Sequence, residues 1–327
     1  MTFKKSLTLA FLLFIFLAAN AQRPINQKPI GPKIKVERFG SRVNTTAPDY
    51  APTRYGGRVY FTSFYKKPDD GTKVARIFSF SESGKATLVN ELDIKRKSAH
   101  IANPAFMPDA SRMYFTICRD SKQERCEIWY RENDFNGGWG VAKRLPEIIN
   151  RRGSTSTQPS IGWDEEQKKF ALFFVSDREG GRGGKDIWVS HISFDGQFET
   201  PYSLPINTAM DDVTPYFDRN TQILYFSSNA RGSNGDFDIC KSQKTGDMWA
   251  RPEGLGRPVN SAYDDLYFTL HDKSGKAYFS SNRPGSMRSA KGRNSFDIYE
   301  VEGMKAYEIV PNNGREKGAY VQSTKDM

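Results

Sequence analysis

The sequence predicts an all-β protein that folds as a β-propeller of five four-stranded blades, and three observations lead to this fold class. Short strings that alternate apolar and polar residues, such as Gln222–Ser228, fill the chain, and no convincing amphipathic helix is present. The 27 Gly and 17 Pro residues separate many of these strings. An aromatic pair also recurs at a nearly constant interval. Its five copies are Tyr60-Phe61, Tyr114-Phe115, Phe173-Phe174, Tyr225-Phe226 and Tyr278-Phe279.

Each aromatic pair lies in a repeating unit of four predicted strands. One strand precedes the pair and is led by Pro in the middle units, as in Gln158–Trp163. A polar or Gly-rich hairpin follows the pair, then a second strand such as Phe296–Val301, and then a closing segment such as Arg257–Asp265. Four short strands at a period near 50 residues are typical of propeller blades, whereas a parallel β-helix repeats at a much shorter interval.

The segment Lys33–Asn44 is expected to close the ring. It resembles the tail of a unit, because Arg42-Val43-Asn44 matches Pro258-Val259-Asn260. We therefore expect it to supply the outer strand of the last blade. The competing donor is Ala306–Val310, and six blades are the alternative if the N-terminal segment pairs separately.

The N-terminal residues 1–21 predict a secretory signal peptide. Lys4 and Lys5 precede the apolar run Leu7–Ala18, and small residues at Ala19 and Ala21 suit a signal peptidase. An uncleaved membrane anchor is the alternative, but the run is short for a hydrocarbon layer of ~30 Å. We expect an extension over residues 22–46, the propeller over 47–310 and a flexible tail over 311–327. The predicted location is the periplasm, the outer-membrane periphery or the cell surface.

The net charge of +10 predicts anionic partners, and it falls by two once Lys4 and Lys5 leave with the signal peptide. Nucleic acid is not expected for an exported protein. The cations are scattered through loops, so solvated loop tips compete with a binding role. The candidate loop residues for binding are Arg178, Arg182, Arg231, Arg283, Arg288 and Arg293.

The three cysteines predict one disulfide. Cys118 and Cys126 flank a single hairpin, so a cross-strand disulfide is expected in an oxidising compartment. Cys240 occupies the position of Trp188 and Tyr299 in other units, which predicts an apolar slot without a partner. The chain has no CxxC or zinc pattern, so we expect no metal or cofactor. Calcium bound by the hairpins is the alternative, although the hairpin spacing matches no dedicated calcium loop.

Two sets of carboxylates recur along the chain. Asp186, Asp238 and Asp297 each open the second strand of a unit, and a residue repeated in every blade is expected to serve the blade by accepting hydrogen bonds from the facing hairpin. The second set precedes the innermost strands and is expected at the rim of the central channel, where it is a candidate for binding or merely hydrates the channel. This set comprises Asp49, Asp211, Asp212, Asp264 and Asp265, with His100 at a neighbouring place.

The repeat Tyr278–Arg283, followed by a Gly-rich hairpin and Phe296–Tyr299, resembles the TolB-like (WD40-like) β-propeller repeat. Its long version with PVNSAYDD linkers is similar to propellers of Bacteroidota cell-envelope proteins, which occur beside OmpA-like domains or in type IX secretion and gliding complexes. The resemblance covers residues 47–301. It implies a non-catalytic protein-interaction scaffold with an envelope protein as partner, and peptidoglycan or an anionic glycan as a further partner.

Glycoside hydrolysis or glycan binding through the channel-rim carboxylates is the alternative. Five-bladed glycosidases use carboxyl groups roughly 5 to 10 Å apart. Here Asp49, Asp212 and Asp265 occupy equivalent repeat positions, which a structural rule also predicts, so an enzyme is not the expected function. The sequence contains no G-x-S-x-G elbow for Ser-His-Asp hydrolysis.

Overall fold

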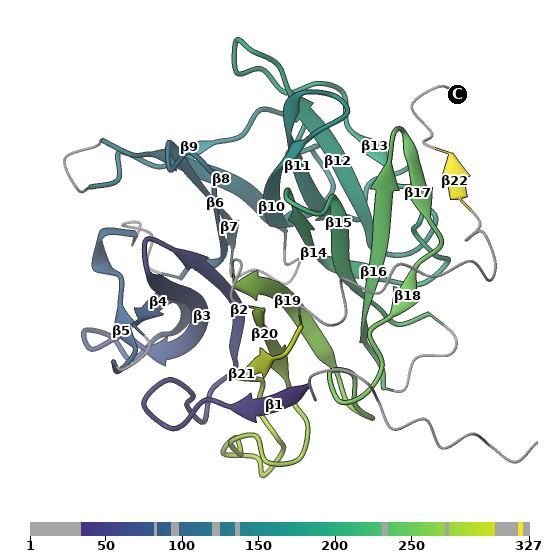
Figure 1. The fold of residues 1–327 in the computed structure, drawn as a ribbon. Coiled ribbons are helices and arrows are strands. Elements are labelled where there is room, and N and C mark those ends of the chain that lie inside the picture. Colours follow the sequence, from purple (N-terminus) through teal and green to yellow (C-terminus); the bar gives the residue numbers. More distant parts are fainter. Residues whose placement is uncertain are drawn as a thin grey trace, which may run out of the picture. The chain divides into compact units, whose positions relative to one another are not determined.

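The computed structural model describes residues 34–81, 84–92, 98–119, 125–134, 138–230, 235–271, 275–304 and 320–322. The predicted signal peptide and the alternative closing segment Ala306–Val310 lie outside these ranges. Among the described residues, no helix has the length and hydrophobicity that spanning a bilayer requires. The strands of this part of the chain form five antiparallel sheets, which confirms the five-bladed propeller (Figure 1).

The blades follow one another in the sequence, and each runs from an innermost to an outer strand. Blade 1 contains β2 (Asp49–Tyr55), β3 (Arg58–Lys66), β4 (Lys73–Phe80) and β5 (Thr87–Leu88), followed by the short 3-10 helix η1 (Asn90–Leu92). Blade 2 contains β6 (His100–Phe106), β7 (Arg112–Cys118), β8 (Cys126–Glu132) and β9 (Lys143–Arg144). Blade 3 contains β10 (Ser156–Asp164), β11 (Lys169–Ser176), β12 (Asp186–Ile192) and β13 (Tyr202–Ser203).

Blades 4 and 5 depart from this simple order. Blade 4 contains β14 (Asp212–Asp218), β15 (Ile223–Ser228), β16 (Asp238–Thr245) and β17 (Met248–Ala250). There β18 (Glu253–Gly254) pairs with β16, and β22 (Tyr320–Gln322) pairs with β17. Blade 5 contains β19 (Asp265–His271), β20 (Lys276–Ser281) and β21 (Asp297–Glu302), and its outer strand is β1 (Lys35–Arg38). The N-terminal segment therefore supplies the fourth strand of the last blade.

A repeated asparagine fixes the segment that joins neighbouring blades. The side chain of Asn260 accepts a hydrogen bond from the Ile239 backbone N–H and donates one to the Ile239 carbonyl, both at 2.9 Å. At the ring closure, Asn44 makes the same two bonds with Ile298, at 2.8 and 3.0 Å. Both asparagines are buried, so these bonds satisfy backbone groups that water cannot reach. The Arg42-Val43-Asn44 match in the sequence is thus the same clamp.

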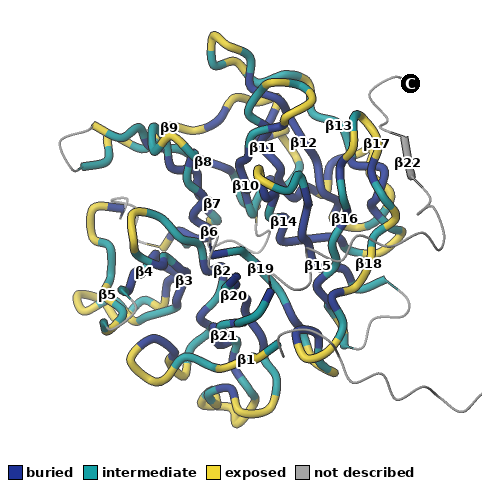
Figure 2. Tube along the Cα trace, viewed as in Figure 1, coloured by how far each residue is buried: buried dark blue, intermediate teal, exposed yellow. Residues whose placement is uncertain are grey.

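The aromatic pairs fill the spaces between blades. Successive residues of a strand point to opposite faces of the sheet. Tyr225 accordingly packs in a cluster with Phe268 and Phe279 of blade 5, whereas Phe226 packs in a cluster with Phe173 of blade 3. Burial is concentrated in the strands, and the hairpins are exposed (Figure 2). The recurring pair therefore joins each blade to both of its neighbours.

The cysteines lie in blades 2 and 4. Cys118 and Cys126 form a disulfide between the adjoining ends of β7 and β8, with a Cα–Cα distance of 4.1 Å. Cys240 on β16 is a free, half-buried thiol. Burial raises its pKa to about 12, so the thiol stays protonated at neutral pH.

Candidate functional site

Every innermost strand carries one non-glycine residue with a left-handed backbone conformation. At each of these positions the register with the next strand shifts. Such a backbone is uncommon for residues other than glycine and is sterically costly for the β-branched Thr214. The recurrence in all five blades gives the propeller axis a ring of equivalent, specially oriented residues, which we call the bulge ring. It consists of Ala51, Asn103, Gln158, Thr214 and Tyr267, with φ values of 53 to 58°.

Hydrogen bonds connect the bulge ring from blade to blade. The backbone N–H groups of Asn103 and Gln158 donate to threonine hydroxyls of the preceding blade, Thr62 and Thr116. The Thr214 N–H donates to Gln158 Oε1 at 2.8 Å. The Tyr267 N–H donates to Thr214 Oγ1 at 3.2 Å. These bonds satisfy the donors that the register shifts remove from the sheets, and they make the bulge ring a fixed platform.

Two bulge-ring side chains also meet across the axis. Gln158 Nε2 of blade 3 donates to the Tyr267 hydroxyl of blade 5 at 3.1 Å. Burial raises the pKa of Tyr267 to about 12, so this hydroxyl is neutral at physiological pH. The Asn103 amide approaches the same hydroxyl, yet its Nδ2 atom is buried without a hydrogen-bond partner in the structure. An amide donor left in this way is costly unless a bound molecule or water accepts from it.

The bulge ring closes one end of an axial pocket. The pocket has a volume of about 440 Å³ and is lined by all five innermost strands, from the bulge ring to the hairpins that follow. Burial decreases along this path: Ala51 and Thr214 are buried, whereas Gly56, Gly57 and Arg219 are exposed. The mouth therefore lies at the hairpin end of the innermost strands, and the bulge ring forms the floor.

Aromatic and charged side chains line the mouth of the axial pocket. The rings of Tyr55 and Phe106 stack with centroids 4.2 Å apart and an angle of 7° between their planes. Arg54 lies 3.2 Å from His271 Nδ1. Asp218 is the single carboxylate among the described lining residues, and it accepts hydrogen bonds from Asn220 and Thr221 in its own turn. The mouth thus offers flat apolar surface beside positive charge.

The carboxylates predicted at the channel rim are placed elsewhere. Asp49, Asp212 and Asp265 are fully buried at the starts of the innermost strands, and none of them lines the axial pocket. Each accepts a hydrogen bond from a backbone N–H four residues earlier, in the segment that enters the blade. Burial raises the pKa of Asp49 to about 7 and also raises the pKa of Asp212. Each of these carboxylates therefore fixes the segment that enters its blade, because its buried oxygen accepts a hydrogen bond from a backbone N–H group of that segment.

The other three rim candidates also make contacts within the protein. His100 Nδ1 accepts from the Ala75 N–H at 3.0 Å. Asp211 accepts from the Lys185 N–H at 2.9 Å. Asp264 accepts from Asn282 Nδ2 at 2.8 Å. All three therefore tie neighbouring segments together outside the axial pocket.

Two of the loop arginines are structural and do not form the predicted binding surface. Arg178 donates to the carbonyls of Ile148 and Ile149, and its guanidinium lies over the rings of Phe174 and Trp188 at 4.9 and 5.3 Å. Burial lowers its pKa to about 10. Arg283 makes the equivalent contacts in blade 5 and also binds Asp265 Oδ1 at 2.6 Å. The strand-end position of both arginines explains this role, because it points them at the carbonyls of the preceding segment.

The remaining arginine candidates are on hairpins. Arg288 and Arg293 are exposed in the hairpin between β20 and β21. Arg182 donates its backbone N–H to Asp186 and its side chain to the Pro205 carbonyl at 3.2 Å. Arg231 lies outside the described residues. The structure does not bring the side chains of Arg182, Arg288 or Arg293 into the axial pocket.

The residues that form the pocket floor were missed from the sequence. Asn103, Gln158 and Tyr267 share one repeat position. It lies two residues after the position that Ile101, Ser156 and Asp265 hold in the same three units. The available signal was the proline that follows four of the five bulge-ring residues. These are Pro52, Pro104, Pro159 and Pro215. Among the described residues, no group of three or more His, Cys, Asp or Glu side chains is placed to hold a metal ion.

Comparisons with known proteins find similarity at the level of the fold. No family model matches the chain, and no curated protein matches it in sequence. A thermostable family-43 glycoside hydrolase superposes with a TM-score of 0.50 at 13% identity, covering 84% of this chain and 90% of that one. The catalytic domain of a GH62 α-L-arabinofuranosidase from Coprinopsis cinerea gives a TM-score of 0.51 at 13% identity, covering 85% and 95%.

These findings correct two expectations. The resemblance to TolB-like envelope propellers is wrong, because no family model supports it and the similar structures are glycoside hydrolases. The non-catalytic protein-interaction scaffold rested on that resemblance and is overturned with it. What these two similar structures share with this chain is the propeller fold.

Proposed function

We propose that this protein binds a carbohydrate in the axial pocket. The observation that carries the proposal is the Asn103 amide, a buried donor without an acceptor, placed beside the Tyr267 hydroxyl at the floor of a solvent-open pocket. The oxygen of a sugar hydroxyl has two acceptor lone pairs, so one hydroxyl can accept from both Asn103 Nδ2 and the Tyr267 O–H. The floor is uncharged at physiological pH, which suits a neutral sugar ring.

The size and lining of the pocket agree with this ligand class. Its volume of about 440 Å³ lies within the usual range for small-molecule sites, roughly 300 to 1,000 Å³. The stacked Tyr55 and Phe106 add an apolar surface at the mouth, on which the C–H face of a pyranose or furanose ring can pack. Because five strands hold the bulge ring, binding requires little reorganisation of the protein.

Glycoside hydrolysis is the second candidate, and the similar glycoside hydrolase structures favour it. Hydrolysis ordinarily requires two carboxyl groups flanking the scissile bond. Asp218 alone is a carboxylate among the described lining residues, and its oxygens already accept hydrogen bonds within a turn. The geometry therefore supports sugar binding better than hydrolysis.

Isothermal titration of a trisaccharide panel tests both candidates. The panel contains xylotriose, arabinotriose, cellotriose and galactotriose, and chromatography of each mixture reports any cleavage. Asn103→Ala is the diagnostic variant, because alanine occupies the equivalent bulge position at residue 51 with a φ of 55°. We expect at least one trisaccharide to bind and the variant to weaken its binding about tenfold, the loss of one well-formed hydrogen bond.

Two outcomes would contradict the binding proposal. One is the absence of binding by every trisaccharide, and the other is binding that Asn103→Ala leaves unchanged while the variant keeps its melting temperature. Cleavage of a bound trisaccharide would establish the second candidate function in the same pocket if Asn103→Ala also reduced it.

A further inference from the structure

A second cleft, in blade 2 and the segment that leads to blade 3, gathers five arginines. It has a volume of about 480 Å³ and is lined by Arg119, Arg125, Arg144, Arg151 and Arg152, with Glu127 and Glu147 as the acidic residues of the lining. The described residues that line the arginine cleft therefore carry an excess of three positive charges. Cys118 pairs with His100 at the start of β6, whereas the axial pocket opens beyond the end of β6 at Phe106. The two sites thus lie at opposite ends of the blade.

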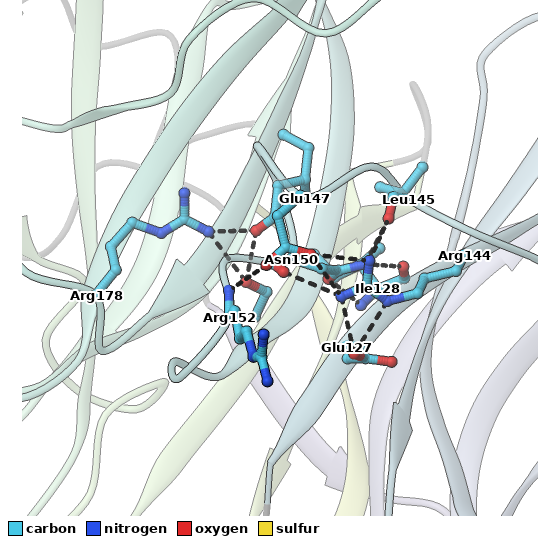
Figure 3. Close-up of polar contacts among 10 residues, drawn as sticks. Glu127, Ile128, Arg144, Leu145, Glu147, Asn150, Arg152 and Arg178 are labelled. Carbon is cyan, nitrogen blue, oxygen red and sulfur yellow. Dashed lines mark hydrogen bonds and ion pairs between the residues drawn. The ribbon is translucent and has the colours of Figure 1, made fainter.

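One wall of the arginine cleft is fixed by buried polar contacts (Figure 3). The Asn150 side chain is buried and bonds the Ile128 N–H and carbonyl, both at 2.8 Å. The Arg144 guanidinium donates to Glu127 at 3.0 Å and to the Asn150 carbonyl at 3.1 Å. Arg178 supports the same segment from behind through its bonds to Ile148 and Ile149. The loop that carries Arg151 and Arg152 is consequently held in one conformation.

The two glutamates do not neutralise the cleft. Glu127 pairs with Arg144, and Glu147 contacts Arg144 and accepts from the Arg152 backbone N–H at 2.6 Å. Within the described part of the chain, no carboxylate forms an ion pair with the guanidinium of Arg119, Arg125 or Arg152. All three residues are exposed. Guanidinium groups bind carboxylates and sulfates through paired hydrogen bonds, so three guanidinium groups without an ion pair among the described residues favour an oxyanion in this hollow.

The disulfide keeps two of these cations together. Arg119 follows Cys118, Arg125 precedes Cys126, and the Arg119 N–H lies 3.5 Å from the Arg125 carbonyl. Like charges at the neck of one hairpin repel each other, and the covalent bond beside them prevents the hairpin from separating. Arg152 faces the same hollow from the fixed loop. Guanidinium groups are thus fixed on two sides of the cleft before any ligand binds.

We infer that the arginine cleft binds an acidic polysaccharide through its carboxylate or sulfate groups. The hollow is larger than one tetrahedral anion, and its positive groups come from two separate segments, which suits consecutive charged sugars. No aromatic side chain is among the described lining residues, so the base stacking of single-stranded nucleic acid has no platform there. The described lining residues include no apolar side chain either, which disfavours a folded protein partner. This inference does not depend on the axial pocket.

Titration calorimetry at low ionic strength tests it with defined probes. The probes are a galacturonate hexasaccharide, a heparin-derived hexasaccharide, an uncharged galactose hexasaccharide, inorganic sulfate and a single-stranded oligonucleotide of equal charge. The variant is Arg119→Gln with Arg152→Gln, and Arg288→Gln is the matched control on an exposed hairpin of another blade. We expect one acidic hexasaccharide to bind and the double variant to weaken it at least about tenfold, because two charge-assisted contacts are lost. The control should leave binding unchanged.

Several results with the control variant and the other probes would contradict the inference. An equal loss in Arg288→Gln would show diffuse attraction to a basic surface. Sulfate or the oligonucleotide binding as tightly as the acidic hexasaccharide would overturn the polysaccharide assignment, and so would binding of neither acidic probe. The melting temperature verifies that the double variant is folded. Trisaccharide binding in the axial pocket is measured separately, so a failure of the arginine-cleft inference can be told from a failure of the proposed function.

Discussion

Gln158 Nε2 donates a hydrogen bond to the hydroxyl of Tyr267 at 3.1 Å, and this contact joins blade 3 to blade 5 across the propeller axis. Neither residue belongs to a neighbouring blade of the other, so the bond fixes the floor of the axial pocket from two directions. The hydroxyl can still donate its own proton to a bound molecule. It is therefore the second polar group, after the Asn103 amide, that we expect to select a sugar hydroxyl.

Replacing Tyr267 by phenylalanine should weaken trisaccharide binding about threefold to tenfold, because one neutral hydrogen bond contributes about 0.5 to 1.5 kcal/mol. The ring and its packing against Tyr50 remain, but Gln158 Nε2 loses its acceptor, so the melting temperature is measured beside the affinity. Calorimetric titration of the variant measures the change. Tyr263→Phe, at an exposed tyrosine in the loop before β19, is the matched control and should bind like the wild type. Equal affinities of Tyr267→Phe and Tyr263→Phe would contradict a role for the hydroxyl.

The closure of the ring should depend on Asn44. Asn44→Ala leaves the buried N–H and carbonyl of Ile298 without their side-chain partner. We expect a loss of roughly 2 to 4 kcal/mol in the free energy of unfolding, since each buried unsatisfied group costs about 1 to 3 kcal/mol. Urea denaturation measures it, with Asn260→Ala as the comparison at an interior junction. A loss below about 0.5 kcal/mol at Asn44 would mean that the N-terminal strand does not close the ring in solution.

The raised pKa of Asp49 should make stability depend on pH. Burial raises the pKa of Asp49 to about 7, so the folded protein keeps this proton up to about pH 7, whereas the unfolded chain releases it near the ordinary aspartate pKa of 3.8. Between these values the folded state binds more protons, so the free energy of unfolding falls as the pH rises. Asp49→Asn cannot ionise, and its stability relative to the wild type should grow between pH 4 and 7.5 by roughly 2 to 4 kcal/mol.

Thermal or urea unfolding of both proteins across this pH range gives the comparison. Asp109→Asn, in an exposed turn, is the control and should follow the wild-type curve. Parallel curves for the wild type and Asp49→Asn would show that the Asp49 carboxyl ionises as freely in the fold as in the unfolded chain.

A buried ionic group joins blades 3 and 4. Asp164 lies 2.9 Å from His191 Nε2 and 3.0 Å from Lys244 Nζ, and all three side chains are buried. Burial alone would raise the pKa of Asp164, but the bond from His191 and the charge of Lys244 lower it to about 2. Lys244→Met should cost about 3 to 5 kcal/mol in the free energy of unfolding, because it leaves a buried carboxylate without its cation.

Lys168→Met, in blade 3, provides the contrast. Lys168 pairs with Glu165 at the surface, where an ion pair contributes about 0 to 1 kcal/mol. Urea denaturation of the two variants should therefore differ by at least about 2 kcal/mol. Similar stabilities would mean that the buried group contributes no more than a surface pair.

The sequence contained the information for the blades but not for the pocket. The aromatic pair and the Asn44 match repeat with the blades because each does the same work at every junction, so both stand out as periodic signals. The pocket floor depends on one repeat position at which each of the five blades carries a different residue, with Asn103, Gln158 and Tyr267 among them. A one-residue register shift decides which side chain reaches the axis, and the sequence pattern alone does not reveal that shift.

The acidic residues at the strand starts show the opposite limitation. Asp212 and Asp265 are easily found in the sequence as a repeat, yet their burial results from the way the preceding segment folds over them. Arg178 and Arg283 were expected at loop tips for the same reason, although packing between blades places both against backbone carbonyls. A local sequence pattern does not show the contacts between consecutive blades. Those contacts are needed to tell structural charged residues from candidate binding residues.

A crystal structure of the protein with its tightest-binding trisaccharide would show where the sugar binds. We predict a sugar in the axial pocket, with one hydroxyl about 3 Å from Asn103 Nδ2 and within hydrogen-bond distance of the Tyr267 hydroxyl. A trisaccharide bound at any other place, with the axial pocket holding solvent, would contradict it.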